Sequence, residues 1–423
     1  MTTSTISRGR SNPLFDPMLI QAPFASEATG GRELVNLDEL GLFAEILGAE
    51  GGYQNQGDIL YALADGVDPN ALWAEFQQTL EIFNARRQTI VSLMTYPVTQ
   101  LIETVPQVGD VEFEEASEYG IPKAVGIRQD YFQMAYDFKD YDLATRYTWK
   151  YLRDADARAV QAVHNAILTA DNRLVFRKVM EAIFDNRNRT ADIRNQPYNV
   201  YALYNNDGTI PPTYKNTTFL STHDHYLVSG AAAFQSIDIE DGINLIAEHG
   251  YGQEQGTTFV VLMNSAQMAV ARTFRAGATI NGAVCNYDFI PAPNQPALFV
   301  PNAEGLIGVR PPNSWNGLPV VGSYKNALLV EEDYIPPGYL LVLGSGGTGN
   351  LQNPVGLREH ANTAYRGLRL LPGNQQRYPL VDSYYSRAFG TGIRQRAGAS
   401  VVQIKASGSY DIPTAYTRGG GLL

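Results

Sequence analysis

Residues 132–139 read FQMAYDFK, and this stretch decides the kind of fold that we expect. Polar and apolar side chains alternate along it, which is typical of a β-strand with two different faces. The apolar side chains of one face are Phe132, Met134, Tyr136 and Phe138. This strand is the second arm of a β-like stretch over residues 96–150, whose charged middle, residues 107–128, contains Gly and Pro. A two-stranded ribbon is marginal alone in water, so its apolar face must lie on another surface, and a second copy of the chain is the partner that we expect.

The ribbon leads directly into a long helical pattern over residues 154–186. Apolar residues recur there at helical spacing: Val160, Val163, Ile167, Leu168, Leu174, Val175, Val179 and Ile183. A helix of about 33 residues is about 50 Å long. Heptad spacing is not sustained, so we predict a spine against which a sheet packs rather than a coiled coil.

The rest of the chain predicts an N-terminal arm and a mixed α/β region. Residues 1–35 are punctuated by Pro and Gly, a short helix is predicted over residues 37–47, and Asp68 with Pro69 marks the start of a second helix. Residues 187–235 are predicted to be rich in loops, because turn residues are frequent there. A helix (237–249), a strand (257–263) and another helix (265–275) follow. The short strands expected after them are residues 306–309, 318–321, 327–330, 339–343 and 400–405.

Composition narrows the choice of function. The net charge of −11 argues against a protein that binds DNA tightly through clustered Lys and Arg. A single cysteine, Cys285, excludes an internal disulfide framework and favours synthesis in the cytosol. We find no secretion signal and no apolar run long enough to span a bilayer.

Two sequence motifs could form a catalytic or binding site. Residues 344–349, GSGGTG, fit the glycine pattern of a dinucleotide site, but the residues after them, ending in Pro354, cannot open the helix that such a site needs. We expect a flexible surface loop instead. We expect His223 and His225 to lie on one face of a strand, where they could share a metal ion, yet no third His or Cys is near them in the sequence. Structural histidines are therefore expected.

No signature of an enzyme is found beyond these motifs. Cys285 has no neighbouring base, and the acidic clusters pair with no evident substrate site. We expect no catalytic activity, no cofactor and no bound metal.

The order of elements resembles the major capsid proteins of tailed bacteriophages, which have the Hong Kong 97 fold. Short patches add to the resemblance: residues 317–321, GLPVV, and 335–344, IPPGYLLVLG, look like strands near the end of that family's axial domain. The resemblance implies an α+β chain in five parts. These are an N-terminal arm (1–95), an extended β-hairpin loop (96–150), a peripheral domain with the spine helix (151–236), an axial domain (237–375), and return strands of the peripheral domain with a C-terminal tail (376–423).

By this resemblance, the protein assembles as hexamers and pentamers into an icosahedral shell around the double-stranded DNA of a tailed phage. It would lie in the virion capsid, after assembly in the host cytoplasm. Its partners would be other copies of itself, a separate scaffolding protein, a portal protein and a decoration or minor capsid protein. It would enclose DNA without reading its sequence and would not bind a membrane. The residues expected between subunits are Glu112, Glu114, Glu115, Lys123, Arg128, Phe132, Met134, Tyr136 and Phe138.

Some members of this family cross-link a lysine of the extended loop to a neighbouring subunit, and Lys123 is the one candidate near the expected loop tip. Two alternatives to a phage capsid remain. One is an encapsulin, a cellular compartment of the same fold that encloses protein cargo. The other, from a different class, is a nucleotide- or metal-dependent enzyme.

Overall fold

The computed structural model describes residues 47–48, 51–52, 62–85, 89–107, 113, 115, 118, 120, 130–215, 217–252, 256–295, 310–372 and 380–417. The chain divides into two compact units, residues 1–59 and 60–423. In the first unit, β1 (Leu47–Gly48) pairs with β2 (Gly51–Gly52) in an antiparallel ladder. The predicted helix over residues 37–47 lies outside the described residues except for Leu47, which is in β1.

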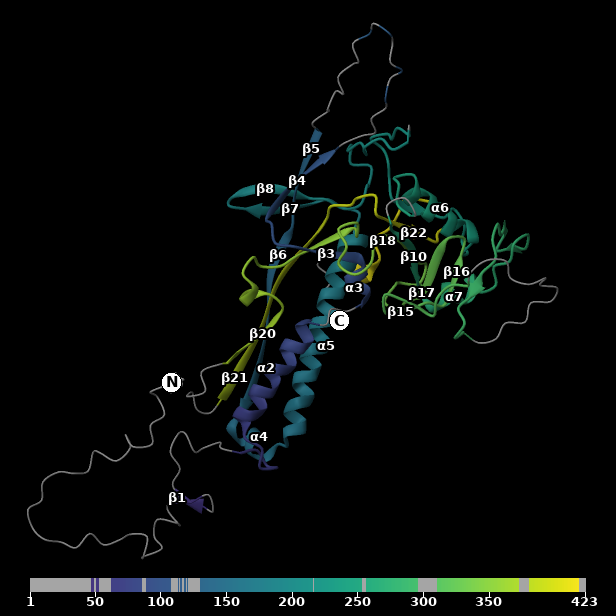
Figure 1. Cartoon of the computed structure of the whole chain (residues 1–423). Coiled ribbons are helices and arrows are strands. Elements are labelled where there is room, and N and C mark those ends of the chain that lie inside the picture. Colours follow the sequence, from purple (N-terminus) through teal and green to yellow (C-terminus); the bar gives the residue numbers. More distant parts are fainter. Residues whose placement is uncertain are drawn as a thin grey trace, which may run out of the picture. The chain divides into compact units, whose positions relative to one another are not determined.

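The second unit contains the predicted spine. Helix α5 (Ala157–Phe184) has 28 residues and is therefore about 42 Å long. A short helix, α4 (Trp149–Asp154), precedes it, and Thr148 caps α4 by accepting a hydrogen bond from the Tyr151 N–H. Helix α2 (Pro69–Ala85) begins at the predicted Pro69, and it runs beside α5 (Figure 1). Helix α3 (Thr89–Met94) contacts the other half of α5.

A sheet of long strands lies along this spine. Its strand order is β20 (Leu368–Pro372), β21 (Leu380–Ile393), β19 (Val355–Arg358) and β3 (Thr95–Val98), and β6 (Asp137–Thr148) also pairs with β21. Twelve residue pairs join β6 to β21, from Asp137 opposite Thr391 to Thr148 opposite Leu380. At about 3.4 Å per residue, this ladder is about 40 Å long and so matches the length of α5. One core cluster fills the space between α2, α5 and this sheet, with Leu72, Phe76, Ile167 and Tyr385 among its members.

The other sheet has seven strands. Its order is β13 (Ile290–Pro291), β16 (Gly322–Tyr324), β17 (Ala327–Glu331), β10 (Thr258–Met263), β18 (Tyr339–Ser345), β22 (Ala399–Gln403) and β9 (Tyr226–Val228). Helices α6 (Ser236–Ala247) and α7 (Ser265–Ala271) accompany it.

Both faces of the seven-stranded sheet are covered, which explains the continuous apolar run of β10. Val260 and Leu262 belong to the core cluster shared with the second half of α5. Val261 and Met263 belong to the cluster shared with α6 and α7. Helix α6 approaches the sheet closely, because a Cβ on Gly242 would lie 2.8 Å from Cγ2 of Val342.

The remaining described elements are short. They are β7 (Arg189–Ile193) with β8 (Gln196–Val200), β11 (Thr279–Ile280) with β12 (Ala283–Val284), β14 (Ser314–Trp315) with β15 (Leu318–Pro319), and the 3₁₀ turns η2 (Thr363–Tyr365) and η3 (Thr414–Tyr416). The β7–β8 hairpin lies where loops were expected. The predicted strand over residues 306–309 lies outside the described residues. Among those described, no helix combines the length and apolarity needed to cross a bilayer.

Two of the expected segments, residues 96–150 and residues 376–423, are each divided between different sheets. Residues 96–150 do not form one hairpin, because β3 and β6 belong to the sheet along the spine. Only β4 (Ile102–Gln107) and β5 (Asp130–Ala135) pair with each other as two arms. The last strand, β22, does not return to the spine sheet; it lies between β18 and β9 in the seven-stranded sheet.

Candidate assembly hairpin

The β4–β5 hairpin projects beyond the sheet along the spine (Figure 1). Its register places Ile102 opposite Ala135 and Gln107 opposite Asp130. Successive residues of β5 point to opposite faces. Phe132 and Met134 therefore share one face, and Tyr131 and Gln133 share the other.

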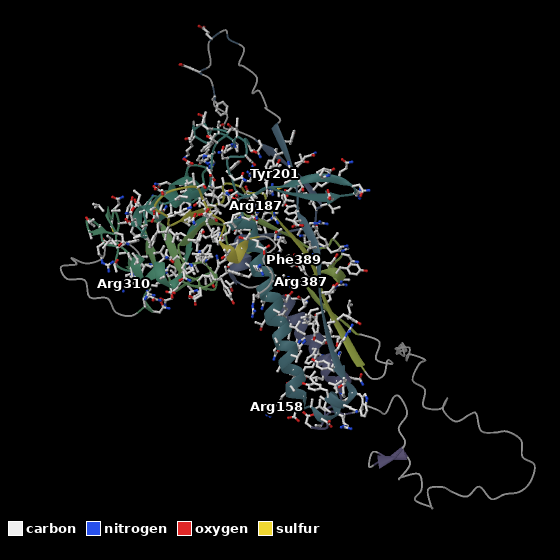
Figure 2. All side chains as sticks on the ribbon, turned by 180° about the vertical axis from the view of Figure 1, so that it is seen from behind. Arg158, Arg187, Tyr201, Arg310, Arg387 and Phe389 are labelled. Carbon is white, nitrogen blue, oxygen red and sulfur yellow. The ribbon has the colours of Figure 1, made fainter. Side chains whose placement is uncertain are left out.

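The predicted apolar face packs against the chain's own body. Met134 and Tyr136 are fully buried in a cluster with Tyr96 and Val98. Phe132 is half-buried and meets the ring of Tyr201 edge to face, with 5.3 Å between ring centroids; Tyr201 is labelled in Figure 2. The expectation that this face is held for a neighbouring subunit is therefore wrong for Met134 and Tyr136, because no accessible surface of these two side chains remains.

Tyr136 is the anchor of the hairpin. It lies where the chain leaves β5 and enters β6, and its ring covers a pair of glycines that face each other across β19 and β21. A Cβ on Gly356 would lie 2.4 Å from Cε1 of Tyr136, and one on Gly392 would lie 2.8 Å from its Cδ1. Glycine at both positions thus provides the space that the buried ring fills.

A chain of polar contacts fixes the Tyr136 hydroxyl. It donates to Oε2 of Glu103 at 2.6 Å, and it lies 3.1 Å from the hydroxyl of Tyr96. Oε1 of Glu103 is 3.2 Å from Nε of Arg394. Burial, the neighbouring Tyr96 and the hydrogen bond to Glu103 raise the pKa of Tyr136 well above its usual value. The phenol therefore stays protonated and remains a donor to the carboxylate of β4.

Phe138 is held in a similar way. It is half-buried, and the guanidinium carbon of Arg358 lies 4.3 Å from the centre of its ring. A cation over an aromatic face at this distance is attracted by the ring. Arg358 is itself buried, and burial lowers the pKa of its guanidinium.

Of the charged residues expected between subunits, Glu115 is the one that the structure describes. Glu115 is exposed. Glu112, Glu114, Lys123 and Arg128 lie outside the described residues, so their role stays a prediction. Among the described residues of this region, sequence reasoning missed the accessible apolar side chains of Phe113 and Tyr131, of which Tyr131 is 54% exposed.

The glycine-rich segment 344–349 is not a phosphate loop. Ser345 is buried and its hydroxyl donates to the carbonyl of Leu93. The buried Asn353 side chain donates to the carbonyls of Ser92, Thr95 and Gly347. Rather than a flexible surface loop, the segment is held by these hydrogen bonds against the junction of α3 and β3, and the chain continues from it into β19 rather than into a helix.

The histidines differ from the expectation. His223 and His225 are joined by His249, which follows the end of α6, and the three side chains could together hold a metal ion. Asp224 is not part of this group; its carboxylate accepts a hydrogen bond from the Tyr226 N–H. The third histidine was missed because it lies 24 residues from His225 in the chain.

Comparison with known proteins gives one strong similarity. A solved structure from Mycobacterium phage Patience is 53% identical, with a TM-score of 0.70, and the match covers 88% of this chain and 99% of that one. Two other similar structures are far more distant. The mature capsid of bacteriophage PhiM1 is 11% identical, with a TM-score of 0.43, and the match covers 76% of this chain and 89% of that one. The holo-SrpI encapsulin complex from Synechococcus elongatus is 10% identical, with a TM-score of 0.40 and the same coverage of the two chains. No protein-family model and no curated protein sequence matches the chain.

Proposed function

The chain belongs to the family of phage major capsid proteins, and from this premise we propose that it assembles as hexamers and pentamers into an icosahedral shell around double-stranded DNA. The observation that carries the proposal is the 53% identity over 99% of the phage Patience chain. At that identity the two chains share their fold over the matched length, which supports a common role for them.

The hairpin supports the proposal by its construction. Its base is fixed by Tyr136 and the Gly356–Gly392 pair, while Phe113 and Tyr131 stay exposed. Tyrosine and phenylalanine are enriched in protein interfaces, because rigid aromatic rings bury much area at small entropic cost. We propose that the exposed side of the hairpin lies on a neighbouring copy, together with the N-terminal arm and the charged residues Glu112, Glu114, Glu115, Lys123 and Arg128.

The charge of the chain suits a container for DNA. With a net charge of −11, the wall has little attraction for phosphate, and packaged DNA is not retained by tight contacts. We propose that the shell encloses DNA without reading its sequence. A scaffolding protein would guide assembly in the host cytoplasm, a portal protein would occupy one vertex, and a decoration or minor capsid protein would complete the particle. No catalytic activity is proposed.

Electron microscopy of the protein, expressed with a scaffolding protein from the same genome, tests this proposal. Uniform hollow shells support it, and a protein that stays monomeric under every condition contradicts it. Virions treated with nuclease distinguish the two shell functions. Protected double-stranded DNA is expected for a capsid, whereas protein cargo without DNA would indicate an encapsulin. Boiling the particles in detergent tests a cross-link through Lys123, because a cross-linked shell leaves no free monomer.

A further inference from the structure

Three histidines from separate segments place their Nε2 atoms at one point of the second unit. His223 and His225 come from the loop before β9, and His249 comes from the turn after α6. The Nε2 atom of His223 is 2.8 Å from that of His249 and 3.1 Å from that of His225, and the third separation is 3.3 Å. All three side chains are largely buried.

Hydrogen bonds alone do not satisfy such a triangle. Each neutral Nε2 either carries a proton and donates or is bare and accepts. Because three Nε2 atoms share only two states, protonated or bare, at least two of them must be in the same state. Two N–H groups or two lone pairs then face each other at about the distance of a hydrogen bond. A cation at the centre removes this conflict, because all three nitrogens then direct lone pairs at it.

The surroundings prepare His225 as a ligand. Its Nδ1 donates to the carbonyl of Ala399, the first residue of β22, at 2.7 Å. The neutral ring therefore has a bare Nε2 that points to the other two histidines. A hydrogen bond from the second ring nitrogen to a carbonyl is the usual way in which proteins orient a metal-binding histidine.

The site is also shielded from solvent, because His225 and His249 are buried. The ring of Phe219 stacks on His249, with 4.2 Å between centroids. A nearby cation, Arg396, is balanced by Asp207 at 2.8 Å.

We propose that His223, His225 and His249 bind one Zn²⁺ ion. Tetrahedral zinc with Zn–N bonds of about 2.0–2.1 Å separates its ligand nitrogens by about 3.3 Å, so the shortest observed separation, 2.8 Å between His223 and His249, needs to widen by about half an ångström and the other two by less. Three imidazoles favour zinc over magnesium or calcium, which prefer oxygen ligands. The Glu248 carboxylate lies near two of these nitrogens, with Oε1 3.6 Å from Nε2 of His223 and 4.0 Å from that of His249.

The ion would hold separate segments of the fold together. It joins the loop before β9 to the end of α6, and through the His225 bond to Ala399 it also fixes the start of β22. These segments are separated in the sequence by 24 to 176 residues (His225 to His249 and His223 to Ala399). Because zinc binds the folded arrangement and not the unfolded chain, its binding stabilises the subunit.

The test uses the full-length protein, purified, stripped with a chelator and dialysed against Zn²⁺. Metal analysis is expected to find one zinc per chain in the wild type and in the control His360→Gln, whose histidine is exposed and not part of the cluster. His223→Gln and His249→Gln are each expected to weaken zinc binding by more than about 100-fold, beyond what the loss of an outer partner costs. Cobalt in place of zinc should give the visible absorption of a tetrahedral site.

A second measurement covers the case in which a variant does not fold. The thermal unfolding midpoint of the wild type is expected to rise with zinc and to return after the chelator is added. Zinc content that is equal in the wild type and in both cluster variants would overturn the proposal. So would a wild-type midpoint that does not respond to zinc, and the three histidines would then be a packing cluster alone.

Discussion

Replacement of Tyr136 by alanine should destabilise the isolated subunit. The side chain is 1% exposed and its ring fills the space above Gly356 and Gly392. Removing a buried aromatic ring costs about 3–5 kcal/mol, and loss of the hydroxyl also takes a hydrogen bond from Glu103, worth about 1 kcal/mol. We expect a loss of about 4 kcal/mol in the free energy of unfolding. Urea denaturation of dissociated subunits measures it, as a midpoint lowered by ~1–2 M.

The matched control is the same substitution at Tyr131, which lies five positions before Tyr136 in the sequence and is 54% exposed. Tyr131→Ala should leave the unfolding free energy within about 0.5 kcal/mol of the wild type, and it should reduce shell assembly. If Tyr136→Ala leaves the stability of the isolated subunit unchanged and blocks only assembly, the ring is held for a neighbouring subunit, and our reasoning about its burial is refuted.

Three further predictions concern the interior of the second unit. Arg396→Gln removes a buried guanidinium that donates to two backbone carbonyls and should lower the free energy of unfolding by about 3–5 kcal/mol. Arg153→Gln, at an exposed position, should have a much smaller effect, and equal losses in urea denaturation would contradict this. Gly356→Ala should lower the free energy of unfolding by about 1–3 kcal/mol, because the added methyl group overpacks the site. The double variant with Tyr136→Ala should lose less than the sum of the two single losses. Strictly additive losses would show that the two residues are not in contact. Burial lowers the pKa of His164, so the unfolded chain binds this proton first. Stability due to this group is therefore present above about pH 6.5 and is lost as the pH falls, by up to about 1.4 kcal/mol per pH unit. His164→Phe should flatten the loss of stability between pH 7 and 5, and an unchanged pH profile would exclude the histidine as its source.

Local sequence patterns were sufficient to predict the helices α2 and α5. Asp68 with Pro69 marks the start of α2, and the apolar residues from Val160 to Ile183 mark α5, because caps and helical periodicity act between residues a few positions apart. The apolar run over residues 257–263 likewise predicted a strand, which the structure shows as β10; that both of its faces are covered became clear from the structure.

The limits of the hairpin were not predictable from alternation. The pattern continues from Phe132 through Tyr136 to Phe138, yet the pairing partner changes at Tyr136 from β4 to β21. Strand β21 lies more than 240 residues further along the chain, and a periodicity of two is the same whichever partner is paired. The decisive signal, the facing glycines 356 and 392, has meaning only when the register of β19 and β21 is known.

The histidine cluster was hidden for a similar reason. His223 and His225 share a short segment, but His249 reaches them only because α6 packs closely on β18 and β22, through the contact at Gly242. The β7–β8 hairpin was missed because its turn residues, Arg194 and Asn195, adopt positive φ, and arginine is not a typical signal of such a turn.

The most direct test of the central claim, that this chain builds a phage shell through its projecting hairpin, is a cryo-electron microscopy reconstruction of the assembled particle. We predict one chain at both the five-fold and the six-fold positions of an icosahedral shell, with Tyr131 in contact with a neighbouring copy and Tyr136 buried in its own subunit. A closed shell in which every β4–β5 hairpin contacts only its own chain would contradict the account.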